Sequence, residues 1–166
     1  YDMPTAVFLG SRQSSSVSLL SESVAALGNG LILAAPESGS VEILGENGDS
    51  LGSWTQWGRF PFQHPAAIAV DPRPNRARSY VFDRGLSMVI RMHQDGVAET
   101  LFHLDEGKTY ADLAVDSEGI VYLINVTDNV VEVRTPLGGL LRSMPCLYPI
   151  GKVAIDRMDS LYLSSP

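Results

Sequence analysis

Hydrophobic and polar positions follow one another along this chain in a pattern that returns four times. Each copy is a run of small apolar residues closed by one residue, which is polar in three copies, and then a β-branched or aromatic run. The copies are Val24–Leu27 with Leu31–Leu33, Ile68–Asp71 with Tyr80–Phe82, Leu113–Asp116 with Val121–Leu123, and Val153–Asp156 with Leu161–Leu163. The closing positions 27, 71, 116 and 156 are 44, 45 and 40 residues apart. A repeat of this length built from short strands is typical of the blades of a β-propeller.

Two further strands follow the pattern in the first three copies. Predicted third strands are Val41–Ile43, Val89–Met92 and Val131–Val133, and predicted fourth strands are Leu51–Trp57, Ala98–His103 and Leu140–Met144. Turns with Asn-Gly, Asp-Gly or Gly-Gly separate them, and these pairs favour hairpins because they tolerate positive φ. The alternation over Val131–Arg134 predicts one buried and one wetter face. The sequence therefore predicts an all-β fold of four-stranded antiparallel blades, with Ala-rich innermost strands that fit close to a shared axis.

The chain ends predict two half-blades around three complete blades. We expect one β-propeller domain over residues 1–166, with complete blades over 24–57, 66–103 and 111–144 and half-blades over 5–20 and 152–164. The first half-blade has the pattern of third and fourth strands, and the second has that of first and second strands. Pairing of the two would close a four-bladed ring and remove exposed edges. The other interpretation is an arc of a larger propeller whose remaining blades are missing or come from another chain.

The second and third copies resemble the NHL repeat. The resemblance is carried by Pro65–Asp71, Tyr80–Asp83 and Met88–Arg91, and most closely by Asp112–Leu123. It implies a propeller with four-stranded antiparallel blades. NHL proteins are mostly interaction platforms, so the resemblance also implies a binding role. Related six-bladed propellers include the calcium-dependent gluconolactonases and the strictosidine-synthase-like proteins.

The gluconolactonase resemblance would imply a metal-binding acid in a Pro-Asp-Gly phrase shortly before the inner-strand Asp. The matching places here are Pro65-Ala66-Ala67, Tyr110-Ala111-Asp112 and Ile150-Gly151-Lys152. None has the acid in register, although Asp112 lies one residue away. Calcium needs several hard oxygen ligands that converge on one point, and the sequence supplies no such set. We therefore predict no metal, no cofactor and no catalytic residue.

A repeated acid at the end of the inner strands has a structural explanation. Asp71, Asp116 and Asp156 each close a copy of the repeat. An Asp at such a place can accept hydrogen bonds from the backbone of the following turn. Its recurrence in three blades favours this structural role over a unique active site.

Composition narrows the function mainly by exclusion. Twelve basic and nineteen acidic residues give a net charge of −7, which argues against nucleic acid because binding to phosphates depends on clustered Lys and Arg. No apolar run approaches the roughly 20 residues that span a bilayer. The single cysteine, Cys146, is predicted to be a buried thiol. The chain opens on Tyr1, so we expect that the natural start and any targeting segment were removed, and no compartment is indicated.

Two segments stand out from the repeat as candidate partner-binding surfaces. The first is aromatic, and its proposed binding residues are Trp54, Trp57, Arg59 and Phe60. Trp and Arg are enriched at binding hot spots, whereas the alternative for the rings is packing between blades. The second is an inserted basic loop with Arg73, Arg76 and Arg78. It suits an acidic partner, although such charge runs are often only solvated.

These observations predict a non-enzymatic, NHL-like propeller that acts as a protein-binding or assembly module and could be a subunit of a larger complex. One alternative is a calcium-dependent lactonase or hydrolase of the gluconolactonase class. Another is a small-molecule or glycan binder that uses the aromatic segment. The triplet Asn125-Val126-Thr127 is a glycosylation sequon if the chain is secreted from a eukaryote.

Overall fold

The computed structural model describes residues 23–27, 30–35, 39–45, 47–71, 78–93 and 96–166. Every regular element over these residues is a strand, and every strand pair is antiparallel. Among them there is no helix that could cross a membrane. The predicted all-β class is therefore confirmed. The half-blade predicted over residues 5–20 lies outside the described residues.

The described residues form three four-stranded sheets and two two-stranded sheets. Blade 1 contains β1 (Ser23–Leu27), β2 (Gly30–Ala35), β3 (Ser40–Gly45) and β4 (Ser50–Trp54). Blade 2 contains β7 (Pro65–Val70), β8 (Arg78–Asp83), β9 (Met88–His93) and β10 (Ala98–His103). Blade 3 contains β11 (Tyr110–Val115), β12 (Val121–Asn125), β13 (Val130–Arg134) and β14 (Leu140–Pro145). The half-blade contains β15 (Lys152–Ile155) and β16 (Leu161–Ser164), and a short hairpin of β5 (Gln56–Trp57) and β6 (Phe60–Pro61) joins blades 1 and 2.

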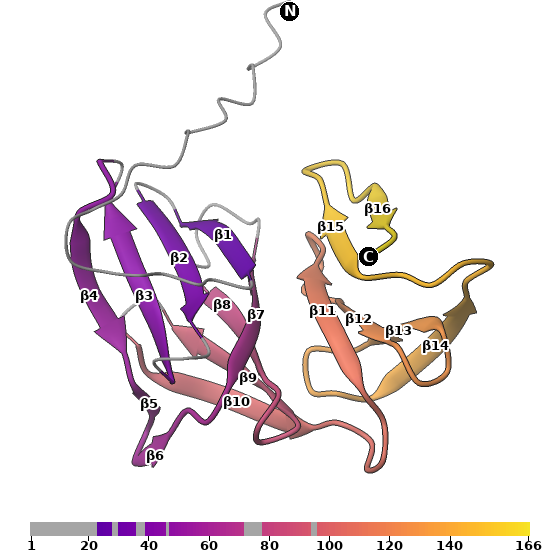
Figure 1. Cartoon of the computed structure of the whole chain (residues 1–166), viewed down its shortest axis with the longest axis horizontal. Coiled ribbons are helices and arrows are strands. Elements are labelled where there is room, and N and C mark those ends of the chain that lie inside the picture. Colours follow the sequence, from indigo (N-terminus) through magenta and orange to yellow (C-terminus); the bar gives the residue numbers. More distant parts are fainter. Residues whose placement is uncertain (1–22, 28–29, 36–38, 46, 72–77, 94–95) are drawn as a thin grey trace, which may run out of the picture.

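The first strand of each blade lies nearest to the shared axis, and the other strands extend outward from it in chain order (Figure 1). β1 packs against β7, β7 against β11, and β11 against β15. No comparable contact joins β15 to β1 in the part of the chain that the structure describes. The described blades therefore form an open arc.

Apolar side chains fill the spaces between neighbouring blades. The cluster between blades 1 and 2 includes Val41, Trp54, Ile68, Ile90 and Met92. The cluster between blades 2 and 3 includes Phe82, Phe102, Leu113 and Leu123. Burial of one large apolar side chain contributes roughly 1.5–3 kcal/mol, so the faces between blades are a main source of stability. Ala66 and Ala67 have no exposed surface, as expected for an inner strand that its neighbours approach closely.

The predicted structural role of the inner-strand Asp is confirmed in two blades. Asp116 Oδ1 accepts the N–H groups of Glu118 and Ile120, each at 2.9 Å, and Oδ2 accepts the Tyr122 hydroxyl at 3.2 Å. Asp156 makes the same three kinds of bond, to Met158, Ser160 and Tyr162. The turn after Asp71 lies outside the described residues. Each carboxylate thus stabilises the turn between the first and second strands and positions the tyrosine of the second strand.

The outer strand of every complete blade contains a one-residue irregularity. The pairing with the third strand skips Leu51 in β4, Glu99 in β10 and Leu141 in β14. Bulges of this kind disrupt a strand edge and protect it from pairing with another chain. By contrast, the register of β15 with β16 is unbroken.

Candidate interaction site

The segment between blades 1 and 2 folds into a hairpin of its own. The sequence predicted one strand through Trp57, but β4 ends at Trp54 and β5 pairs with β6. Gly58 has a φ of 63°, a left-handed conformation that glycine adopts without strain, so the chain reverses within Gly58 and Arg59. Trp57 therefore lies opposite Phe60, and their rings stack with centroids 4.9 Å apart.

The aromatic residues of this segment divide between core and surface. Trp54 and Phe62 are buried in the cluster between blades 1 and 2. A Cβ added at Gly96 would lie only 2.7 Å from Nε1 of Trp54, so this ring fills the space beside the turn that joins β9 to β10. Trp57 is half-buried against the same cluster, and Phe60 is 47% exposed. Phe60 is thus exposed on a hairpin that is flanked by two aromatic residues buried in the core, Trp54 and Phe62.

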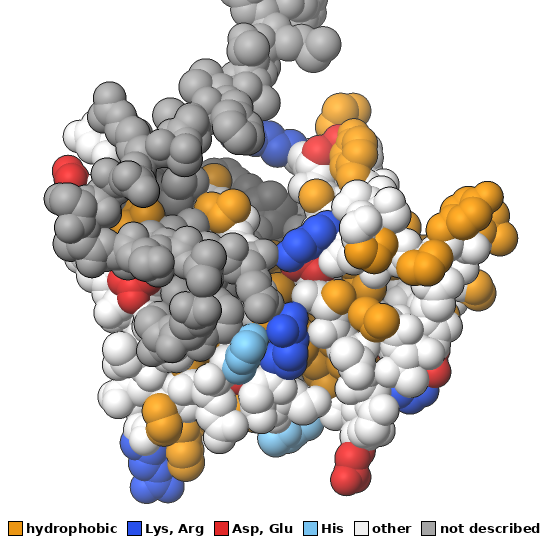
Figure 2. All heavy atoms as spheres, viewed as in Figure 1, with side chains coloured by type: hydrophobic (Ala, Val, Ile, Leu, Met, Phe, Trp, Pro, Cys, Tyr) orange, Lys and Arg blue, Asp and Glu red, His pale blue; other side chains and the backbone are white. Residues whose placement is uncertain are grey.

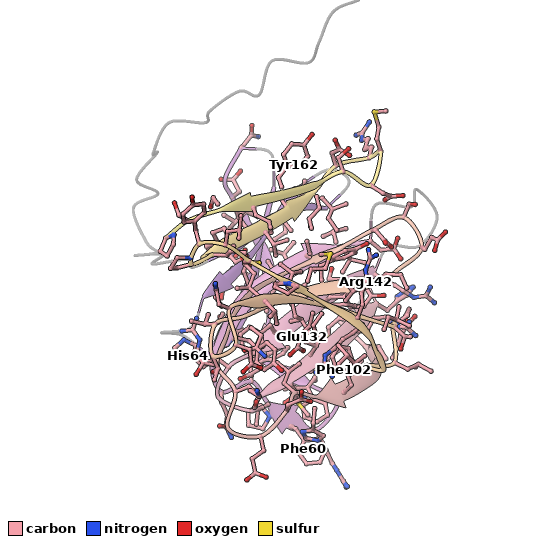
Figure 3. The ribbon with its side chains drawn as sticks, turned by 90° about the vertical axis from the view of Figure 1, so that its right-hand side faces the viewer. Phe60, His64, Phe102, Glu132, Arg142 and Tyr162 are labelled. Carbon is pink, nitrogen blue, oxygen red and sulfur yellow. The ribbon has the colours of Figure 1, made fainter. Side chains whose placement is uncertain are left out.

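Arg59 places a positive charge beside the exposed ring. Its guanidinium carbon lies 5.4 Å from the centroid of Phe60, within the range of a cation–π contact. Basic and apolar side chains meet at the lower left of Figure 2, where Figure 1 shows β5 and β6. Figure 3 shows Phe60 at the lower end of the molecule. We call Trp57, Arg59 and Phe60 the hairpin stack.

The inserted basic loop is described only at its end. Arg73 and Arg76 lie outside the described residues. The Nε of Arg78 in β8 donates to Glu99 Oε2 at 2.6 Å, and the Nε of Arg91 lies 3.1 Å from the same oxygen. The bond from Arg78 is the main cause that lowers the pKa of Glu99. Arg78 is thus engaged in an ion pair within blade 2, and partner binding by the three loop arginines stays a prediction.

The chain that leaves the hairpin is held by one buried carboxylate. Asp83 at the end of β8 has no exposed surface, and its oxygens accept the N–H groups of Gln63 at 2.8 Å, His64 at 2.9 Å and Leu86 at 3.1 Å. His64 Nε2 lies 3.3 Å from an Nη of Arg84. Asp83 therefore positions the entry to β7 and, through it, the base of the hairpin.

Asp112, the acid nearest to the lactonase-like metal position, links two blades. It is buried, and its Oδ2 accepts the N–H of Val153 in β15 at 3.1 Å. Burial is the main cause that raises the pKa of Asp112. Ser23 has the equivalent place in β1, and its Oγ accepts the N–H of Ile68 in β7 at 3.1 Å. Among the described residues, no group of three or more His, Cys, Asp or Glu is arranged to hold a metal ion.

The sequence did not predict a buried polar network in blade 3. Glu132 accepts hydrogen bonds from the Tyr110 hydroxyl at 3.2 Å, from Asn125 Nδ2 at 2.7 Å and from Arg134 Nε at 2.8 Å. Arg134 also reaches Asp105 through Nη2 at 3.0 Å. Glu132 is only 4% exposed, so the network lies in the interior of blade 3. The sequence pattern nearest to this network was the alternation over 131–134, from which one solvent-exposed face was expected. That expectation is wrong, because all four residues are buried between blades. Glu132 and Arg134 pair with each other instead of with water.

The glycosylation sequon and the single cysteine differ in burial from what the sequence indicated. Asn125 has no exposed surface, and its amide donates to Glu132 and to Asp128. The sequon therefore cannot carry a glycan in the folded protein. Cys146 is half-buried instead of buried, and its Sγ lies 3.5 Å from the carbonyl oxygen of Met144.

The network predicts a loss of stability at alkaline pH. Burial, and then the charge of Glu132, raises the pKa of Tyr110 from 10 to about 12. Below pH 10 the phenol is protonated in both states. Between about pH 10 and 12 the unfolded chain releases this proton while the folded chain retains it, so we expect the free energy of unfolding to fall by about 2 kcal/mol. Urea titrations from pH 8 to 12 should show a smaller fall for Tyr110→Phe, and an equal fall in both proteins would contradict the assignment.

The sequence matches no protein-family model and no curated protein. The structure is similar to hydrazine synthase of Kuenenia stuttgartiensis, at 17% identity and a TM-score of 0.64 over 93% of this chain and 45% of that one. It is similar to virginiamycin B lyase of Staphylococcus aureus, at 12% identity and 0.63 over 82% and 45%, and to a streptogramin B lyase, at 8% identity and 0.67 over 90% and 50%. The chain thus spans about half the length of these structures. At such identities the likeness confirms the propeller fold alone, and the resemblance to NHL repeats stays a prediction.

Proposed function

We propose that this propeller is a protein-binding or assembly module and that the hairpin stack is its main contact with a partner. The observation that carries the proposal is the stacked pair of Trp57 and Phe60 with Arg59 beside it. Together they combine an exposed aromatic surface, a cation and a fixed base. This combination is enriched at the centre of protein interfaces.

The hairpin stack is well suited to binding because its side chains already contact one another before a partner binds. Phe60 has few rotatable bonds, and its ring already stacks on Trp57. Binding of a partner would therefore cost little side-chain conformational entropy at Phe60. Arg59 can keep its contact with the ring while its donors face a partner carboxylate. We therefore expect a partner segment that offers an apolar side chain next to an acidic one.

The other predicted binding residues would have secondary roles. Trp54 is buried, so it would support binding by holding the hairpin in place. The basic loop with Arg73, Arg76 and Arg78 would supply a second contact with the acidic part of a partner. Both roles rest on sequence and position.

The proposal predicts that single substitutions in the hairpin stack weaken capture of a partner at least tenfold. Immobilised wild-type protein, Phe60→Ala and Arg59→Glu should be incubated with the same extract, and the bound proteins quantified by mass spectrometry. We expect at least one protein to be retained by the wild type and reduced at least tenfold on both variants, because hot-spot truncations typically cost 2 kcal/mol or more. Trp57→Phe should retain most binding, since a stacked ring remains.

The matched control is Leu137→Ala, which removes another exposed side chain, on a turn of blade 3. It should capture the same proteins as the wild type. Circular dichroism and thermal unfolding should show that all variants remain folded. If every captured protein binds the stack variants as well as the control, the hairpin is not the contact.

The alternative predictions have a separate test. Glycan or small-molecule binding is favoured by the exposed face of Phe60, which a sugar ring could cover. Titration of oligosaccharides against tryptophan fluorescence would show this, because Trp57 lies under that ring. A calcium-dependent rise in melting temperature together with lactone hydrolysis would instead favour the enzyme.

A further inference from the structure

Blade 2 carries charged side chains at two places where the other complete blades have apolar ones. Arg91 in β9 takes the place that Ile43 has in blade 1 and Val133 in blade 3, since each lies opposite the same position of the second strand. Glu99 is the residue that the pairing skips in β10, and the residues skipped in β4 and β14 are both leucines. The repeat therefore requires no charge at either place. Charges that break a local pattern in this way often mark a functional site.

These two residues meet a third charged residue, Arg78 at the start of β8. Its Nε donates to Glu99 Oε2 at 2.6 Å, and the Nε of Arg91 lies 3.1 Å from the same oxygen. The side chains of Arg78, Arg91 and Glu99 are 27%, 19% and 22% exposed. They are open to a ligand but partly withdrawn from water, where charges interact more strongly than on a fully exposed surface. We call these three residues the arginine cluster.

The carboxylate of Glu99 does not satisfy both guanidinium groups. Its Oε2 accepts the bond from Arg78, whereas the Nε of Arg91 is buried and makes no hydrogen bond to any described residue. A buried donor without an acceptor is unfavourable. Each guanidinium has five N–H donors in a planar fork, and one carboxylate has only two oxygens. The arginine cluster therefore has an excess of donors, which an anion with several oxygens could satisfy.

Two further titratable residues act on the arginine cluster. Asp71 is buried, and its charge raises the pKa of Arg78, although less than the bond to Glu99 does. His93 is exposed and contributes to the lowering of the pKa of Glu99. Residues 71–78 hold three arginines and one aspartate. This part of an acidic protein is therefore locally basic.

We propose that the arginine cluster binds a phosphate group, as free phosphate or as a small phosphomonoester, and that Glu99 occupies the site when no phosphate is bound. A phosphomonoester carries close to two negative charges at pH 7 and three acceptor oxygens, which matches two guanidinium groups. Arginine also binds phosphate through pairs of parallel hydrogen bonds. The net charge of −7 disfavours a long polyanion such as nucleic acid, so the ligand is a small molecule.

The bulge in β10 allows Glu99 to give way to the ligand. Its neighbours Ala98 and Thr100 pair with β9, whereas Glu99 itself is the extra residue and has no partner in the pairing. Its side chain can therefore leave the two arginines without loss of a strand pair. A phosphate oxygen in its place could accept the unsatisfied N–H of Arg91 as well as that of Arg78.

The arginine cluster lies apart from the hairpin stack. β7 leads away from the hairpin of β5 and β6 (Figure 1), and Arg78 lies near its far end because β8 runs antiparallel to it. The six residues of β7 separate the two ends by roughly 15–20 Å. The inference uses no residue of the hairpin stack, so phosphate binding and capture of a protein partner can fail independently.

Isothermal titration of inorganic phosphate and of glycerol phosphate tests the site. We expect both to bind the wild type. Glu99→Gln should bind them at least tenfold more tightly, because it removes the competing charge and keeps the size of the side chain. Arg91→Gln should bind them at least tenfold more weakly, because it removes charged donors. An ion pair with a purely structural role would bind neither ligand in any of these proteins.

The matched control is Arg157→Gln, which removes the charge of an arginine that is exposed on the turn between β15 and β16. It should bind phosphate as the wild type does, and chloride at equal ionic strength should give no binding signal. Circular dichroism must show that each variant is folded, and if Arg91→Gln is not, Arg78→Gln provides the same test. The proposal is overturned if neither the wild type nor Glu99→Gln binds phosphate. It is also overturned if Glu99→Gln binds no more tightly, or if the folded arginine variant binds as well as the wild type.

Discussion

Replacement of Glu132 with alanine is expected to lower the free energy of unfolding by about 3–5 kcal/mol. The carboxylate is buried and accepts hydrogen bonds from Tyr110, Asn125 and Arg134. Its removal leaves the buried guanidinium of Arg134 with the partly exposed Asp105 as its remaining ionic partner. A buried charge that loses its buried partner costs more than the lost bond itself. Urea unfolding monitored by circular dichroism would measure the change as a lower midpoint at an unchanged slope.

Two variants separate the charge from the loss of packing. In Glu132→Leu combined with Arg134→Met, both charges disappear and the volume is largely kept, so we expect the part of the lost stability that is due to the unpaired charge to return. The cost of the Tyr110 hydroxyl and the Asn125 amide, which lose their acceptor, should remain. Arg134→Met alone should be destabilised, because Glu132 would then be the unpaired charge. If the double variant is as unstable as the sum of the two single variants, the pair does not act as a unit.

Asp83→Ala is expected to cost about 3 kcal/mol and to loosen the base of the hairpin. The carboxylate accepts three backbone N–H groups, from Gln63, His64 and Leu86. Because Asp83 has no exposed surface, water would not readily replace it, and each buried donor left without a partner costs roughly 1–3 kcal/mol. Hydrogen exchange should become faster at the amides of Gln63 and His64, which directly follow the hairpin.

Asp156→Ala is the matched control for this substitution. Asp156 also accepts backbone N–H groups, from Met158 and Ser160, but its turn is exposed to solvent. Water can replace the lost acceptor there, so we expect a cost below about 1 kcal/mol. Equal losses in Asp83→Ala and Asp156→Ala would mean that burial does not govern the effect.

The repeat predicted the blade architecture because it depends on local chemistry. Alternation of apolar residues, Gly-containing turns and small residues in the first strands all reflect constraints within a few positions of each residue. The turn role of Asp116 was predictable for the same reason, since the groups that donate hydrogen bonds to its carboxylate lie within six residues. The same patterns left the number of blades in the ring open, because closure depends on contacts between distant segments.

The candidate site was predictable as a segment but not as a surface. The aromatic run pointed to Trp54 and Phe60 alike, yet one ring is buried and the other exposed. That difference depends on Gly96, more than 40 positions after Trp54, whose turn meets the indole. No residue near Trp54 in the sequence predicts this contact.

The strand pattern, the turn residues and the acidic charge could be read from the amino-acid order, because short-range preferences decide them. Three further properties required blades to pack against one another in space. They are the burial of Glu132 with Arg134, the burial of the sequon residue Asn125, and the exposure of Val24 and Tyr162 at the two ends of the arc. Each of the two faces of a propeller strand packs against a neighbouring blade. The sequence of one strand does not show whether both of these blades are present.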